Sequence, residues 1–98
     1  NYIYKMQNTI LEFFGTMIFL LSILYVTKNK YSTIITSLIV GGTLAFMVFN
    51  SASMGGTAHF NPAVSLMMFC NKKIDLNRFL MNILSQFLGG LVALQIPI

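Results

Sequence analysis

The sequence has 98 residues, of which 56% are apolar and only 8% are charged. Soluble domains carry about 25% charged residues, so this composition excludes an ordinary soluble domain and predicts an integral membrane protein. The net charge of +4 does not indicate binding to nucleic acid, because the basic residues lie at the ends of apolar runs and form no patch with interleaved aromatic residues.

Two long apolar stretches come first in the chain. The first runs from about residue 9 to 27, interrupted only by Glu12, and the second covers about 32–54. A helix needs about 20 residues to cross the ~30 Å hydrocarbon core of a membrane, and both stretches are long enough. Between Lys30 and Lys72 the sequence has no Asp, Glu, Lys or Arg. Both stretches are therefore predicted to be transmembrane helices.

The next apolar stretch, residues 62–70, is too short to span. Asn61 is a favoured N-cap residue and Pro62 is favoured at the first helical position, so a helix is predicted to begin there. At 1.5 Å per residue this helix reaches only about 15 Å, half of the hydrocarbon core. Gly55 and Gly56 break the second span before it. The pattern predicts a re-entrant half-helix, which membranes tolerate only where protein buries it or it lines a watery cavity.

A third transmembrane helix is predicted over residues 76–97. The basic residues indicate the orientation of the whole chain, because cytoplasmic loops are enriched in Lys and Arg. With a cytoplasmic N-terminus, four basic residues lie inside and two lie outside. The inner four are Lys5, Lys72, Lys73 and Arg78, and the outer two are Lys28 and Lys30. A multi-pass protein with a cytoplasmic N-terminus is expected.

Three short motifs follow one another along the chain. Residues 12–16 read Glu-Phe-Phe-Gly-Thr, 56–65 read Gly-Thr-Ala-His-Phe-Asn-Pro-Ala-Val-Ser, and 85–90 read Ser-Gln-Phe-Leu-Gly-Gly. They resemble the first-helix motif, the first Asn-Pro-Ala signature and the third-helix motif of the aquaporin, or major intrinsic protein, family. Thr57 stands where that family usually has glycine. The resemblance implies the N-terminal half of an all-α, inverted-repeat membrane fold, with three transmembrane helices and one re-entrant half-helix.

The resemblance also implies a passive channel for water and small uncharged solutes. The positive end of the half-helix and the amide of Asn61 are expected to repel protons and cations while binding a neutral molecule. For the side chain of His59, a structural hydrogen-bonding role is favoured over a gate. The residues expected at the pore are Asn61, Pro62 and Ala63, together with the backbone carbonyls of Thr57, Ala58 and His59.

Glu12 lies within a predicted span, where an ionisable residue costs about 2.5–3.5 kcal/mol or more. In the family this glutamate is a structural brace for the re-entrant loop, and Gln86 is its expected counterpart on the third span. A proton relay is the alternative, but it requires further titratable groups in series. The only other acidic residue, Asp75, lies in a polar link.

Gly41 stands twenty positions before Asn61, where the family places a residue of its narrowest constriction. A missing side chain there would widen the pore and favour an aquaglyceroporin-like channel for glycerol, urea or similar solutes. The alternative is that Gly41 permits close helix packing, since it forms a small-xxx-small pair with Ala45. Phe46 is close enough in sequence to fill part of the gap.

The sequence contains no Cys/His metal cluster, phosphate-binding glycine loop or catalytic constellation, so no enzyme activity, cofactor or metal is expected. The family has six spans and two half-helices, so the chain is expected to be a fragment that lacks the C-terminal half-channel, a complete half-length protein being the alternative. The resemblance implies a homotetramer when complete, with membrane lipid, water and neutral solutes as its partners. A non-conducting remnant, or an adhesion or assembly subunit of the same fold, is the competing function.

Overall fold

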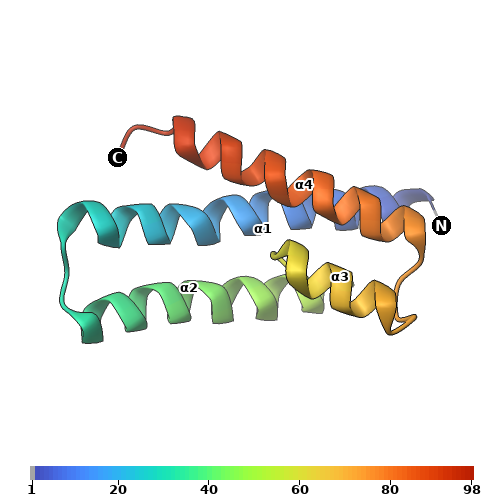
Figure 1. The fold of residues 1–98 in the computed structure, drawn as a ribbon, viewed down its shortest axis with the longest axis horizontal. Coiled ribbons are helices and arrows are strands. Elements are labelled where there is room, and N and C mark those ends of the chain that lie inside the picture. The colour runs from blue at the N-terminus through green and yellow to red at the C-terminus, as the bar shows by residue number, and fades with distance from the viewer. Residues whose placement is uncertain (1) are drawn as a thin grey trace.

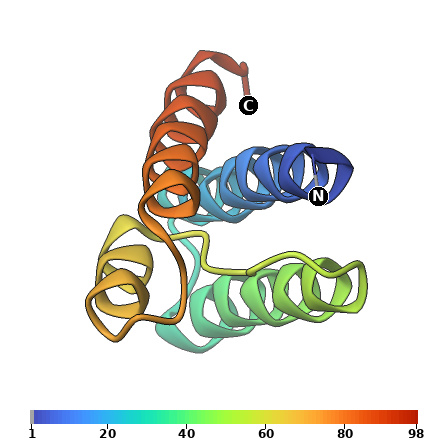
Figure 2. The same ribbon diagram turned by 90° about the vertical axis from the view of Figure 1, so that its right-hand side faces the viewer.

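A computed structural model describes residues 2–98, and all regular secondary structure in that range is helical. The helices are α1 (Tyr2–Asn29), α2 (Thr33–Ser53), α3 (Pro62–Cys70) and α4 (Leu76–Gln95). Helices α1 and α2 run antiparallel, α4 crosses α1, and the short α3 lies beside α4 (Figures 1 and 2). Helix α1 packs against both α2 and α4, and α3 packs against α4. The central position of α1 makes it the scaffold for the rest of the chain.

Helix α1 extends beyond the expected span of 9–27 at both ends, α2 is one residue shorter than expected at each end, and α4 ends two residues early. Helix α1 begins at Tyr2 rather than near residue 9, because Asn8 is buried and paired inside the protein and the helix continues beyond the apolar run. Helix α4 ends at Gln95 rather than near residue 97. The residue before a proline is biased towards extended backbone, and Ile96, before Pro97, has φ −79° and ψ 123°.

Side-chain oxygens cap the starts of α2 and α4. Ser32 accepts a hydrogen bond from the N–H of Ile35 at 3.2 Å, and Asp75 accepts one from the N–H of Arg78 at 2.8 Å. Each bond satisfies one of the backbone donors that a helix start leaves without a partner. At the end of α1, Lys30 takes a left-handed conformation with φ 53°, which stops the helix and turns the chain into α2.

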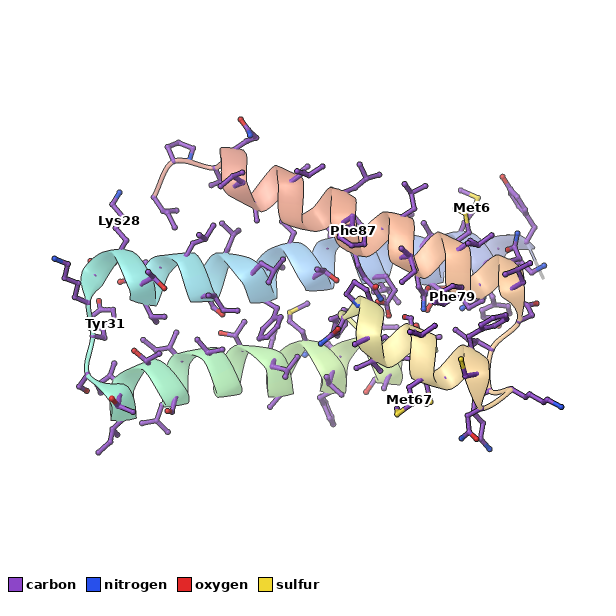
Figure 3. The ribbon with its side chains drawn as sticks, viewed as in Figure 1. Met6, Lys28, Tyr31, Met67, Phe79 and Phe87 are labelled. Carbon is purple, nitrogen blue, oxygen red and sulfur yellow. The ribbon has the colours of Figure 1, made fainter. Side chains whose placement is uncertain are left out.

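The described residues bury polar side chains and expose apolar ones. Nine polar or charged side chains are buried, against three hydrophobic ones, Val26, Phe60 and Ala93. Large apolar side chains such as Met67 and Phe87 cover the outside of the molecule (Figure 3). Water would oppose this distribution, whereas lipid does not. By length and composition, α1 and α2 are able to cross a membrane.

Glycines allow α1 and α4 to touch along their backbones. A Cβ atom on Gly89 would lie 2.6 Å from the carbonyl oxygen of Phe13, and one on Gly15 would overlap the ring of Phe60. Small residues at helix contacts are the usual means by which membrane helices approach closely. The close contact between Gly15 and the ring of Phe60 therefore fixes the loop that carries Phe60 against α1.

Candidate functional site

The irregular segment between α2 and α3 carries the candidate site. Three of its residues have positive φ angles: Gly55 at 83°, Ala58 at 57° and Phe60 at 54°. Left-handed backbone is unfavourable for residues that carry a side chain. Ala58 and Phe60 therefore keep these angles only because the surrounding structure holds the segment, an arrangement that clusters at functional sites.

Glu12, on α1, holds this segment with both carboxylate oxygens. Its Oε2 accepts hydrogen bonds from Thr57 Oγ1 at 2.7 Å and from the N–H of His59 at 2.8 Å. Its Oε1 accepts from the N–H of Phe60 at 2.9 Å and from Gln86 Nε2 at 2.9 Å. The carboxyl group is fully buried, and these four donors offset the loss of hydration. The structure thus brings Glu12 and Gln86 together across α1 and α4.

Two asparagines extend the cluster, and sequence reasoning missed both. Asn8 Oδ1 accepts the N–H of Thr57 at 2.7 Å, and Asn8 Nδ2 donates to Asn82 Oδ1 at 2.8 Å. Asn82 Nδ2 in turn donates to Thr57 Oγ1 at 3.1 Å. Asn8 stands four residues before Glu12, and Asn82 stands four before Gln86. That spacing puts each pair on one helix face and was the pattern that could have revealed them.

The side chain of His59 is held by hydrogen bonds inside the cluster. Its Nδ1 lies 2.8 Å from Ser65 Oγ and 3.2 Å from Asn82 Nδ2. Ser65 Oγ also accepts from Gln86 Nε2 at 3.0 Å. The ring of His59 is thus held at Nδ1 by two side chains that themselves belong to the cluster.

The start of α3 presents Asn61 to the outside of the bundle. Asn61 is extended and exposed, and its Oδ1 caps the helix by accepting the N–H of Ala63 at 2.8 Å. Pro62 occupies the first turn, where its missing N–H costs nothing. No described residue accepts a hydrogen bond from Asn61 Nδ2. The amide is oriented by its cap and keeps its donor side available.

Donors and acceptors of the loop backbone are used unequally. The N–H groups of Thr57, His59 and Phe60 all donate to Asn8 or Glu12. The carbonyl oxygens of Thr57, Ala58 and His59 accept no hydrogen bond from any described residue. Backbone carbonyls removed from water are normally paired. The loop is therefore a row of acceptors suited to a hydrogen-bonding solute or water.

A hollow of about 400 Å³ lies beside Asn61, between α1 and α4. Thr16 and Gln86 line it, and both are buried. Within the described part of the chain, Thr16 Oγ1 and Gln86 Oε1 have no hydrogen-bond partner. A buried polar atom without a partner costs about 1–3 kcal/mol. Both oxygens belong to residues that line the hollow.

Gly41 lies apart from this cluster. It is an exposed residue of α2, and no described atom comes within 4 Å of a Cβ atom built on it. The neighbouring Gly42 has the same open surroundings. Within the chain, the missing side chain of Gly41 therefore serves no helix contact, and it leaves open space on α2.

The stacked rings of Phe69 and Phe79, with centroids 4.9 Å apart, fix α3 to α4. The half of the site formed by α3 is thus attached to the same helix that carries Asn82 and Gln86.

In the comparison with known proteins, the chain matches the model of the family described as Major intrinsic protein over residues 1–96. No curated protein and no solved structure matches the chain significantly.

Proposed function

The chain belongs to the major intrinsic protein family, whose members are channels for water or small solutes, and we propose that it conducts water and uncharged solutes of the glycerol and urea type. The unpaired carbonyls of Thr57, Ala58 and His59 carry the proposal. A hydroxyl or amide solute would donate to these oxygens and accept from Asn61 Nδ2, and would thereby replace its lost hydration. The protein acts as a passive pore and performs no chemical step.

Three transmembrane helices and one half-helix form the proposed membrane fold. Helix α4 has 20 residues and is about 30 Å long, enough to span. Its hydropathy is lowered by Asn82 and Gln86, but both side chains are buried in the polar cluster and neither meets lipid. Helix α3 has nine residues and is about 14 Å long, so it reaches only mid-membrane.

Protons and cations are excluded, in this proposal, by the start of α3. A helix N-terminus carries roughly half a positive charge on its unpaired N–H groups. Asn61 stands at that end, where it adds a neutral donor and no negative charge. A cation would meet a repulsive field there, whereas a neutral solute would find a hydrogen bond.

A second, inverted half completes the pore in this proposal. It would cover the hollow beside Asn61 and supply hydrogen bonds to Thr16 and Gln86, two of the three described residues with a buried side-chain oxygen that has no partner, the third being Ser51. Inverted repeats that meet at broken helices in mid-membrane are a common plan for membrane transport proteins. The complete channel is proposed to be a homotetramer. The outward apolar surface of α2, where Phe46 and Phe49 are exposed, is available for contacts between subunits.

Conduction is tested with the complete channel in proteoliposomes by stopped-flow light scattering. In an impermeant sugar, we expect the proteoliposomes to shrink faster than protein-free vesicles. With glycerol or urea, we expect them to reswell faster than protein-free vesicles. A pH dye inside the vesicles should show no added proton leak. Rates equal to those of empty vesicles in every gradient would instead favour the non-conducting subunit.

The Asn61→Asp variant tests the role of the amide in the same vesicles. Aspartate caps a helix as well as asparagine, so the fold is kept while the donor is replaced by a negative acceptor. We expect slower solute flux together with a new proton or cation leak. Asn71→Asp is the control, because Asn71 is an exposed residue at the opposite end of α3. Equal effects of the two substitutions would contradict the placement of Asn61 in the pore.

A further inference from the structure

One end of the bundle gathers most of the charged residues of the chain. The N-termini of α1 and α4 and the C-terminus of α3 meet at this end (Figures 1 and 2). Four basic residues and one acidic residue lie there, and they are Lys5, Lys72, Lys73, Arg78 and Asp75. The excess of positive charge would attract anionic groups at the membrane surface.

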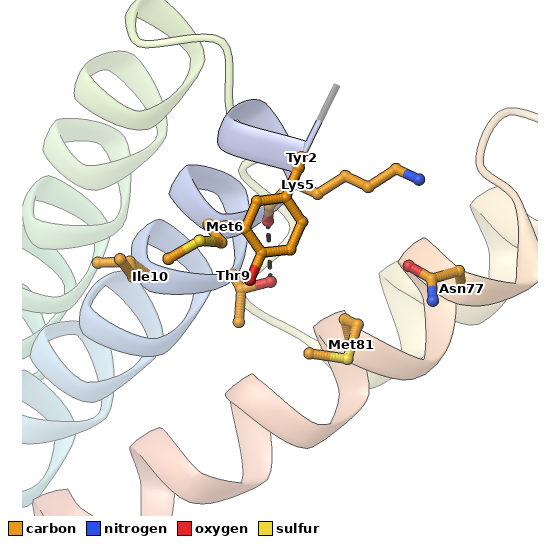
Figure 4. A pocket seen from close by; sticks show the side chains of 7 residues that line it. All are labelled: Tyr2, Lys5, Met6, Thr9, Ile10, Asn77 and Met81. Atoms are coloured by element: carbon orange, nitrogen blue, oxygen red, sulfur yellow. Dashed lines mark hydrogen bonds between the residues drawn. The ribbon is translucent and has the colours of Figure 1, made fainter.

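A hollow of about 460 Å³ opens between α1 and α4 at this basic end (Figure 4). Met6 and Ile10 on α1 and Met81 on α4 give it an apolar wall, and Lys5 and Asn77 also line it. Met6 is 47% exposed and Ile10 is 51% exposed, so the wall is largely uncovered. The hollow has the size of a small-molecule site, about 300–1,000 Å³.

The polar groups of this hollow are the ammonium of Lys5, the amide of Asn77 and the hydroxyls of Tyr2 and Thr9, and the ammonium is its only charged group among the described lining residues. Thr9 also lines it, but its hydroxyl already donates to the carbonyl of Lys5 at 3.0 Å. No aspartate or glutamate is among its described lining residues. Lys5 also lines a neighbouring hollow of about 310 Å³ together with Lys73, Arg78 and the acidic Asp75. Three basic residues stand there against one acidic residue, so an anion bound at Lys5 would meet a net positive charge on its other side.

We propose that this hollow binds an anionic phospholipid, with the phosphate at Lys5 and Asn77 and an acyl chain along Met6, Ile10 and Met81. Such a molecule would match both the charged and the apolar part of the hollow. A soluble anion would leave the apolar wall uncovered, and an uncharged lipid would leave the lysine without a counter-charge. The wall belongs to helices of a membrane protein, where the medium that covers apolar surface is lipid.

Native mass spectrometry of the complete channel tests whether the hollow prefers a negatively charged lipid. Phosphatidylglycerol and phosphatidylcholine with identical acyl chains are titrated against the protein, and the affinity of the first bound lipid is compared. We expect Lys5→Gln to weaken phosphatidylglycerol binding about fivefold, the effect of one basic residue near an anionic surface, and to leave phosphatidylcholine unchanged. Lys28→Gln is the matched control, because it removes the same charge from the exposed opposite end of α1. Equal losses in both variants, or no preference in the unaltered protein, would overturn the site.

The apolar wall is tested by filling it. Met81→Trp places a large ring in the hollow, and Leu80→Trp places the same ring next to it on α4, outside the lining residues. We expect only Met81→Trp to weaken the binding of both lipids, with thermal unfolding showing that both variants remain folded. Inorganic phosphate is the last arm. Full displacement of phosphatidylglycerol by phosphate at the same concentration would show a simple anion site and would refute a lipid site.

Discussion

Among single residues, Glu12 holds the loop of the candidate site most directly, with four hydrogen bonds to its two carboxylate oxygens. Two loop N–H groups, a threonine hydroxyl and the amide of Gln86 all donate to its two oxygens. A glutamate that relayed protons would need a chain of titratable groups, whereas these contacts are to backbone and uncharged side chains. The contacts favour the brace over the relay, and the arrangement gives a direct test by substitution.

Glu12→Gln should destabilise the protein and reduce its water permeability. Glutamine has only one acceptor oxygen, so its NH₂ group would face donors such as the N–H of His59. We expect the free energy of unfolding in detergent to fall by about 2–4 kcal/mol. Asp75→Asn is the control, because asparagine also caps a helix well and the change should stay within about 0.5 kcal/mol. Circular dichroism during thermal unfolding measures the stability of both variants. A Glu12→Gln variant as stable as the unaltered protein would contradict the brace.

The two adjacent glycines of α2 allow the constriction to be located. Gly41→Trp should slow glycerol and urea uptake more than tenfold and leave water flux within about twofold, because the indole would narrow the proposed path. Gly42→Trp adds the same bulk about 100° around the helix, where surroundings are equally open. Stopped-flow measurement of glycerol, urea and water flux in proteoliposomes compares the Gly41→Trp and Gly42→Trp variants. If both variants took up glycerol as fast as the unaltered channel, Gly41 would have no place in the filter.

The site could be predicted from the sequence where its interactions join residues close together in the chain, and could not where they join distant residues. Asn61 and Glu12 stand in recognisable motifs, and the cap of α3 is a local interaction over two residues. Asn8 and Asn82 are 74 positions apart, and nothing local shows that they pair. The crossing of α1 and α4 brings the two residues together. The two unpaired atoms on Thr16 and Gln86 likewise required the packed structure.

At the scale of helices, the crossing of α1 and α4 determines the shape of the site, because α1 carries Asn8 and Glu12 and α4 carries Asn82 and Gln86. The start of α3 followed from its cap, Asn61, and α4 begins at Leu76, where the third apolar stretch was expected to begin; the cap that Asp75 forms there was seen only in the structure. The start of α1 did not follow from the sequence, because hydropathy reports where lipid contact begins and does not report where a helix begins. Asn8 lies outside the apolar run and is nevertheless buried.

Gly89→Ala should loosen this crossing. The added methyl group would meet backbone atoms of α1, the carbonyl oxygen of Phe13 at 2.6 Å and the N–H of Met17 at 3.2 Å, and backbone cannot move aside as a side chain can. We expect a loss of about 1–3 kcal/mol in the free energy of unfolding. The methyl group of Gly90→Ala would meet only the end of the Leu20 side chain, at 3.1 Å. The better helix propensity of alanine should offset this contact, so we expect the free energy of unfolding to stay the same or to rise by up to about 1 kcal/mol. Thermal unfolding in detergent compares them, and a neutral Gly89 variant would rule out backbone contact.

For the whole molecule, charge placement predicts which end faces the cytoplasm. The end that holds the start of α1 and the end of α3 carries four basic residues, and the opposite end carries Lys28 and Lys30. Cytoplasmic surfaces of membrane proteins are the more basic ones. The N-terminus is therefore proposed to face the cytoplasm.

Cys70 provides a native reporter of this orientation. It is the only cysteine in the sequence, it is exposed, and it ends α3 at the basic end. In cells, a membrane-impermeant maleimide should leave it unlabelled until the membrane is permeabilised. A Cys70→Ser variant that also carries Lys28→Cys should show the reverse. Labelling of Cys70 from outside intact cells would invert the proposed topology.

The distances in sequence between Glu12 and its partners have a consequence for biosynthesis. Thr57 follows Glu12 by 45 residues and Gln86 follows it by 74. The glutamate is therefore synthesised before all of these donors, and well before Gln86. Its four hydrogen bonds can be complete only after α4 has been made. The loop can settle only after α4 has been synthesised, so it matures later than the helix that follows it.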